Sequence, residues 1–152
     1  MAVILVIGAS RGIGLALVRE YAQAGWQVLA TVRDAEGQAR VQALGSQAFL
    51  VDVLQPESVT ALATALAGQQ IDLAMYVAGV IRRPNARTVP TQADYDAVMH
   101  TNVLGAMQLL PQIGPIVEAS GGMFAFISSS MSQIEGVDDS EAWFYRVSTA
   151  RS

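Results

Sequence analysis

A glycine-rich segment near the N-terminus has the composition and spacing of a phosphate-binding turn. It reads Gly8-Ala-Ser-Arg-Gly-Ile-Gly14 and follows an apolar run, Val3–Ile7, directly. Glycines let a backbone turn sharply and approach a pyrophosphate closely, and the helix that follows offers free N–H groups and a positive dipole end. A tight turn without a ligand is the alternative interpretation. The candidate binding residues of this turn are Gly8, Ser10, Arg11, Gly12, Ile13 and Gly14.

Charged residues further along the chain bear on which nucleotide such a turn would hold. An acid about 20 residues past the glycines binds a ribose diol and favours NAD, and Asp34 lies at about that distance from Gly14. Arg33 stands beside it and Arg11 lies inside the turn, and an arginine pair suits a 2′-phosphate and favours NADP. A solvated pair of Arg33 and Asp34 at a strand end is the structural alternative.

The rest of the chain alternates between short apolar runs and helix-spaced patterns, which predicts βαβ units. The predicted strands are Val3–Ile7, Val28–Val32, Ala48–Val51, Ile71–Val77 and Met123–Ile127. Helices are predicted from Gly12 to Ala24, Asp34 to Leu44, Pro56 to Gly68 and Thr91 to Leu110, with polar loops over residues 79–90 and 128–140 and the start of a further helix at Glu141. Pro111 and Pro115 are expected to bend or break the helix that begins near Thr91. The predicted fold is α/β, a Rossmann-type doubly wound parallel sheet of about five strands, in one domain over residues 1–152.

Composition excludes several classes of protein. The chain has 152 residues, 52% of them hydrophobic and 14% charged, with a net charge of -4. This argues against a disordered chain and against nucleic acid or an anionic membrane as the main partner. The absence of cysteine excludes a disulfide framework and a thiol nucleophile, and His100 is the only histidine, so a metal site is not expected. No apolar run reaches the roughly 18–20 residues of a membrane span, and we expect a cytoplasmic protein.

The glycine turn resembles the signature of the short-chain dehydrogenase/reductase family, and five further motifs resemble that family's motifs in the same order. The motifs around Ser129 and Tyr145 most resemble those of one subgroup of the family, which contains the cell-signalling factor and the small carbonyl reductases. The five motifs are Asp52-Val53, Ala78-Gly79, Thr101-Asn102-Val103, Ile127-Ser128-Ser129 and Tyr145-Arg-Val-Ser148.

The resemblance implies hydride transfer between a nicotinamide and a small-molecule carbonyl or alcohol. It implies that Tyr145 is the acid/base, that Ser129 binds the carbonyl oxygen and that Asn102 anchors a water in a proton relay. It adds Asp52, Val53, Ala78 and Gly79 to Arg33 and the glycine turn as cofactor-binding residues, favours NADP over NAD, and implies a homo-oligomer.

The chain departs from the family's pattern at the residue that lowers the pKa of the catalytic tyrosine. Thr149 stands where the family has a lysine, one helical turn after Tyr145. Free tyrosine has a pKa of about 10, so without a cation we expect the rate to fall by roughly 10²–10⁴-fold. Tyr76-Val77 replaces a pair of asparagines, and the sequence ends at Ser152, so the resemblance implies a C-terminally truncated chain. A non-catalytic dinucleotide-binding or signalling protein, or a fragment without activity, is the alternative.

Overall fold

The computed structural model of the chain describes residues 1–77 and 91–127, which contain a five-stranded parallel sheet. The strands lie side by side in the order β3-β2-β1-β4-β5. Their bounds are β1 Val3–Ile7, β2 Gln27–Val32, β3 Gln47–Leu50, β4 Leu73–Tyr76 and β5 Met123–Phe126. This order reverses between β1 and β4 and confirms the predicted doubly wound fold, and in such sheets ligands bind beyond the carboxyl ends of the strands at the reversal.

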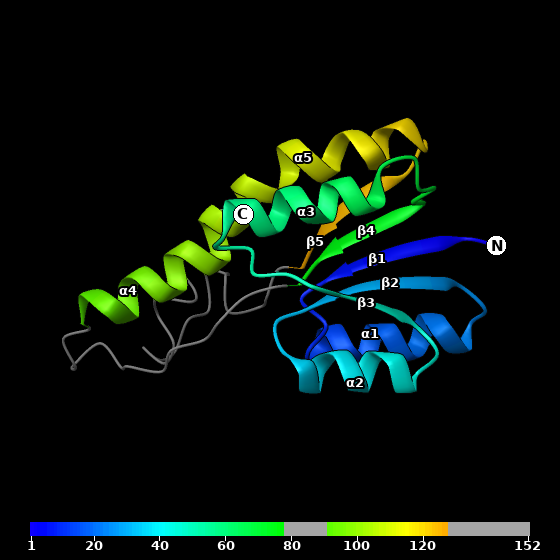
Figure 1. Cartoon of the computed structure of the whole chain (residues 1–152), viewed down its shortest axis with the longest axis horizontal. Helices are drawn as coiled ribbons and strands as arrows, with labels where there is room; N and C mark the ends of the chain where they lie inside the picture. The colour runs from blue at the N-terminus through cyan, green and yellow to red at the C-terminus, as the bar shows by residue number, and fades with distance from the viewer. Residues whose placement is uncertain (78–90, 128–152) are drawn as a thin grey trace, which may run out of the picture.

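Helices cover both faces of the sheet (Figure 1). On one face lie α1 (Gly12–Gln23) and α2 (Ala35–Ala43), and on the other lie α3 (Pro56–Leu66) and α5 (Gly105–Ala119). The remaining helix, α4 (Gln92–Met99), extends beyond the carboxyl ends of the strands, as Figure 1 shows. Thr91, at which the sequence predicts the start of this helix, is its N-cap, because the Thr91 Oγ1 accepts a hydrogen bond of 3.0 Å from the Asp94 N–H.

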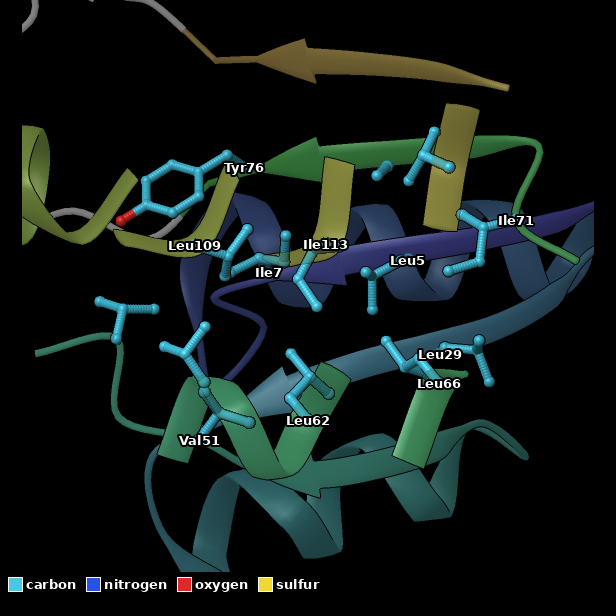
Figure 2. Close-up of a cluster of buried hydrophobic side chains, with 14 of the residues drawn as sticks. Leu5, Ile7, Leu29, Val51, Leu62, Leu66, Ile71, Tyr76, Leu109 and Ile113 are labelled. Atoms are coloured by element: carbon cyan, nitrogen blue, oxygen red, sulfur yellow. The ribbon is translucent and has the colours of Figure 1, made fainter. Parts of the chain in front are cut away.

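The central strand β1 is buried on both faces and joins two hydrophobic clusters. Side chains alternate across a strand, so Leu5 and Ile7 enter the cluster under α3 and α5, and Ile4 and Val6 enter the one under α1 and α2. Figure 2 shows the first cluster, in which Leu109 and Ile113 come from α5. The continuous apolar run that predicted β1 therefore reflects burial on both sides.

Of the two outcomes expected at Pro111 and Pro115, a bend or a break, the structure contradicts the break. Both prolines lie inside α5, on its exposed side. On that side, water can bond the carbonyl groups that lose an N–H partner. The opposite side carries Leu109, Ile113 and Val117 at four-residue spacing, all buried in the core. Packing of this stripe keeps the helix continuous despite the two missing donors.

A π-helical turn, η1 (His100–Leu104), interrupts the helical run between α4 and α5, and sequence periodicity did not predict it. In this turn the Gly105 N–H donates to the carbonyl of His100 rather than to that of Thr101.

No helix in the part of the chain that the structure describes has the length and apolarity to cross a membrane. The polar loops expected over residues 79–90 and 128–140, and the helix expected at Glu141, lie outside the described residues.

Candidate functional site

The glycine turn between β1 and α1 has backbone geometry that only glycine fits. Gly8 and Gly12 have φ angles of 97° and 61°, in the left-handed region that other residues avoid. Gly14 lies where α1 crosses the end of β1, and a Cβ there would overlap the Gly8 carbonyl oxygen and lie 2.8 Å from its carbon. A Cβ at Gly12, by contrast, would meet nothing within 4 Å. The turn is therefore tightly packed at Gly14, whereas the space next to Gly12 is free.

Thr31 holds the turn from the neighbouring strand. Its Oγ1 accepts a hydrogen bond of 3.0 Å from the Gly8 N–H, and its carbonyl accepts one of 2.8 Å from the Ala9 N–H. The side chain is buried, with 2% of its surface exposed. Sequence analysis missed this role of Thr31, although a hydroxyl inside the apolar run Val28–Val32 was a signal.

The N-terminus of α1 has the features of an anion site. Its N-cap residue, Arg11, makes no side-chain capping bond, and the first turn contains no acid. The first N–H groups of a helix have no partner within the helix, and with the helix dipole they attract negative charge. Arg11 and Ile13 are exposed beside them. A Cβ at Gly12 would meet nothing within 4 Å, and together with this free space the arrangement fits a pyrophosphate.

The acid that would select a ribose diol is engaged elsewhere. Asp34 is the N-cap of α2, and its Oδ1 accepts a hydrogen bond of 2.7 Å from the Gly37 N–H. Arg33 is exposed at the end of β2, where its N–H donates to the Ser10 Oγ at 3.0 Å. The proposed solvated pair of Arg33 and Asp34 is not among the ion pairs of the described residues, whereas Asp34 has a clear structural role as a cap.

Arg40 adds a third cation to this corner and was missed by sequence analysis. From α2 its Nη1 donates to the Ser10 carbonyl at 3.0 Å, and its Nη2 lies 3.5 Å from a Glu36 carboxylate oxygen. The start of α2 is packed closely on the glycine turn, since a Cβ at Gly37 would lie 2.9 Å from the Ser10 Oγ. Its position in the sequence gave no signal, because only the packing of α2 against the turn brings Arg40 there.

The segment after β3 contains Asp52 and Val53. The Asp52 Oδ1 accepts a hydrogen bond of 3.0 Å from the Leu54 N–H, and the Asp52 N–H donates to the Ser58 Oγ at the same distance. Asp52 therefore caps the turn before Pro56, and contact with a cofactor stays a prediction. The Val53 side chain is buried in the core, 7% exposed, and a Cβ at Gly105 would lie 2.9 Å from its Cγ2.

The end of β4 connects the glycine turn to Asn102. The Val77 N–H donates to the carbonyl of Ile7 at 2.8 Å, immediately before the turn. The Tyr76 hydroxyl, on the same strand, donates to the Thr101 carbonyl at 2.9 Å. Burial raises the pKa of the Tyr76 hydroxyl, which therefore stays protonated and a donor. Asn102 follows Thr101 in η1 and is buried, with 8% of its surface exposed.

Among the described residues, Arg33 and Arg40 thus lie against the glycine turn, and the turn that carries Asn102 is bonded to β4, the strand next to β1. Five residues to which the sequence analysis gives a role in cofactor binding or chemistry lie outside the described part of the chain: Ala78, Gly79, Ser129, Tyr145 and Thr149. Their roles stay predictions.

Comparison with known proteins identifies relatives of the chain. Residues 2–140 match the family model described as short chain dehydrogenase. D-threitol dehydrogenase from Mycolicibacterium smegmatis is 33% identical over 141 residues, which are 87% of this chain and 54% of that protein. The chain thus spans about half the length of this curated relative.

Solved structures resemble the chain over nearly all of its length. A short-chain alcohol dehydrogenase from Burkholderia multivorans has a TM-score of 0.86 and 29% identity, covering 99% of this chain and 72% of its own. A short-chain dehydrogenase/reductase from the same organism, whose structure contains bound NADP, has a TM-score of 0.87 and 30% identity, covering 98% of this chain and 68% of its own.

Proposed function

The chain belongs to the short-chain dehydrogenase family, and we propose that it binds NADP(H) in preference to NAD(H) at the glycine turn. The observation that carries the preference is the engagement of Asp34. Its carboxylate caps α2, so the residue best placed for a ribose diol already has a partner. Arg33 is exposed at the same corner, and Arg11 is exposed inside the glycine turn. A 2′-phosphate suits arginine because the guanidinium offers several donors in a fixed plane.

Different residues would bind different parts of the nucleotide. The N–H groups at the start of α1, next to Gly12, would bind the pyrophosphate. Arg11 and Arg33 would pair with the 2′-phosphate, and Arg40 would hold the Ser10 backbone in place through the bond that it already makes. Asp52, Val53, Ala78 and Gly79 complete the proposed cofactor-binding set. When bound, the nicotinamide supplies or accepts a hydride.

We propose an oxidoreductase acting on a small carbonyl or alcohol. Tyr145 would exchange the proton at the substrate oxygen, Ser129 would donate a hydrogen bond to the same oxygen, and Asn102 would hold a water that relays the proton. The D-threitol dehydrogenase of Mycolicibacterium smegmatis is named for an alcohol, which supports this substrate class. Thr149 carries no charge to lower the pKa of Tyr145, so we propose that turnover is slow.

A non-catalytic dinucleotide-binding protein is the second candidate, and Thr149 is the residue that favours it. Binding at the glycine turn does not require the lysine that Thr149 replaces, whereas acid–base chemistry by a tyrosine does. In either case we propose self-association, because large apolar side chains are exposed on α5 and β5: Met107, Leu110, Met123 and Phe126.

The test is titration of the purified chain with NADPH and with NADH, followed by nicotinamide fluorescence and by thermal stability. We expect saturable NADPH binding, weaker NADH binding and a rise in Tm with NADPH, since a ligand that binds only the folded state stabilises it. Carbonyl reduction is then assayed with NADPH to separate the two candidates. Absence of binding by both cofactors would refute the proposed function for this chain.

A further inference from the structure

The Tyr76 hydroxyl bonds to the backbone at the point where the helical run changes register. In an α-helix the Gly105 N–H would donate to the Thr101 carbonyl, four residues earlier. Here it donates to the His100 carbonyl, five residues earlier. The hydroxyl of Tyr76 donates to the Thr101 carbonyl instead, at 2.9 Å. A side chain from the sheet thus takes the place of the backbone donor that the π turn removes.

Gly105 lies directly against the same hydroxyl. A Cβ at this position would lie 2.7 Å from the Tyr76 Oη and 2.9 Å from the Val53 Cγ2. Real Cβ atoms do not come so close to other heavy atoms, so the helix can reach the hydroxyl only because residue 105 has no side chain. Figure 2 shows the Tyr76 ring at one end of the hydrophobic cluster, with its oxygen directed toward the helical ribbon.

A purely structural aromatic residue would not need this arrangement. Tyr76 is 5% exposed and its ring lies 5.8 Å from that of Phe126, so phenylalanine would fill the same volume. A buried tyrosine hydroxyl needs a partner, and here that partner is the residue immediately before Asn102. Both Thr101 and Asn102 are buried, so a shift of the turn moves them within packed surroundings.

We propose that Tyr76 is a positioning residue, whose hydroxyl holds the π turn in register and thereby sets the place of Asn102. The proposal rests on the proposed function, in which Asn102 anchors the relay water. Without the hydroxyl, the Gly105 N–H returns to the Thr101 carbonyl, and the turn relaxes toward α-helix. Asn102 then rotates relative to α5 and to the sheet.

The test uses the full chain labelled with ¹⁵N-asparagine, without cofactor. The chain has two asparagines, Asn85 and Asn102, so its spectrum contains few signals and they can be assigned by substitution. We expect Tyr76→Phe to move the backbone and side-chain signals of Asn102 and to speed exchange of the Asn102 backbone amide by about tenfold, the loss of one buried hydrogen bond. Unmoved Asn102 signals in folded Tyr76→Phe would overturn the proposal.

Tyr21→Phe is the matched control. Tyr21 lies on α1, on the other face of the sheet, where its ring packs edge-on against Trp26 at 5.0 Å. The Tyr21→Phe substitution removes the same hydroxyl oxygen, from an aromatic residue of the other cluster. We expect the Asn102 signals to keep their wild-type positions in this variant. A shift as large as in Tyr76→Phe would count against the proposal, because it would show a general response to loss of packing.

A measurement on the unaltered chain covers the case in which Tyr76→Phe does not fold. With ¹³Cζ-labelled tyrosine in an equal mixture of H₂O and D₂O, a hydroxyl that exchanges slowly gives two resolved carbon signals. We expect this splitting for Tyr76, because its hydroxyl is buried and bonded. A single averaged signal would overturn the proposal without any variant.

Both measurements are made on the cofactor-free protein, which separates this proposal from the proposed function. NADPH is titrated afterwards into the wild type and into Tyr76→Phe. If the wild type binds no NADPH while Tyr76→Phe moves Asn102, the proposed function fails and the coupling of Tyr76 to Asn102 stands. If NADPH binds and Asn102 does not respond to the substitution, the proposed function stands and the positioning role fails.

Discussion

Gly14 on α1 lies against the carbonyl group of Gly8 at the end of β1, closer than any residue with a side chain could approach. A Cβ on Gly14 would overlap the Gly8 oxygen and lie 3.0 Å from the Cα of Ala9. The backbone of Gly8 is itself fixed by Thr31 through a 3.0 Å hydrogen bond, so it cannot move aside alone. The helix N-terminus thus reaches the proposed phosphate position only because residue 14 is glycine.

We therefore expect Gly14→Ala to abolish NADPH binding and to lower the free energy of unfolding by about 1–3 kcal/mol, the usual cost of overpacking. Urea unfolding and a fluorescence titration measure the two effects. Gly114→Ala is the control, because Gly114 lies inside α5 and a Cβ there would be 3.5 Å from Leu110, an ordinary contact. It should stabilise the chain by about 0.5–1 kcal/mol through helix propensity. Equal behaviour of the two variants would contradict the steric argument.

The sheet and the glycine turn could be predicted from the sequence because local signals determine them. A continuous apolar run such as Val3–Ile7 needs cover on both faces, and glycines placed after it need a turn. The start of a helix at Thr91 was likewise predicted from the residue pattern, and Thr91 is the N-cap of α4. In each case, residues within a few positions of one another carry the information.

The features that escaped prediction depend on contacts between distant segments. In the π turn at His100–Leu104, Thr101 bonds to Tyr76, which lies 25 residues earlier in the chain. No residue pattern within the helix indicates this turn. Arg40 reaches Ser10 across 30 residues. The helix does not break at Pro111, because the buried side of α5 favours continuity where the local preference of proline favours a break. The π turn that carries Asn102 was thus not predictable from the residues around it.

Arg33 should discriminate between the two nicotinamide cofactors. We expect Arg33→Ala to weaken NADPH binding by roughly 10–100-fold, the loss of a charge-assisted hydrogen bond, and to leave NADH binding nearly unchanged. Dissociation constants for both cofactors, measured by fluorescence at fixed ionic strength, give the comparison. Arg19→Ala, on the exposed side of α1, removes the same charge away from the turn. An equal loss for NADH and NADPH would show that Arg33 does not recognise the 2′-phosphate.

Asp72 should make stability depend on pH in the acidic range. Its carboxylate accepts hydrogen bonds from the Val3 N–H at 2.8 Å and from the Gln70 amide at 3.1 Å, and these lower the pKa of Asp72. A group whose pKa is lower in the folded state stabilises the fold above its unfolded pKa of about 3.9. That contribution is lost as pH falls through the lowered folded value.

We therefore expect Asp72→Asn to be less stable than the wild type near neutral pH, with the difference shrinking below pH of about 4. Urea unfolding at a series of pH values from neutral to strongly acidic measures this convergence. Glu20→Gln on the exposed side of α1 is the control for loss of a carboxylate. A constant difference between wild type and Asp72→Asn at every pH would mean that the substitution acts through packing rather than through charge.

Thr149 is the residue whose replacement separates a slow enzyme from a binding protein. We expect Thr149→Lys to raise the rate of NADPH-dependent carbonyl reduction by roughly 10²–10⁴-fold, because a cation next to Tyr145 lowers the pKa of its hydroxyl toward neutral pH. The pH at which the rate is half-maximal should fall with it. Thr149→Gln introduces a side chain of similar length to lysine but without its charge, and it should give no gain in rate. If the lysine variant binds NADPH as the wild type does and still reduces no carbonyl, the missing cation is not what limits this chain, and the non-catalytic function is favoured.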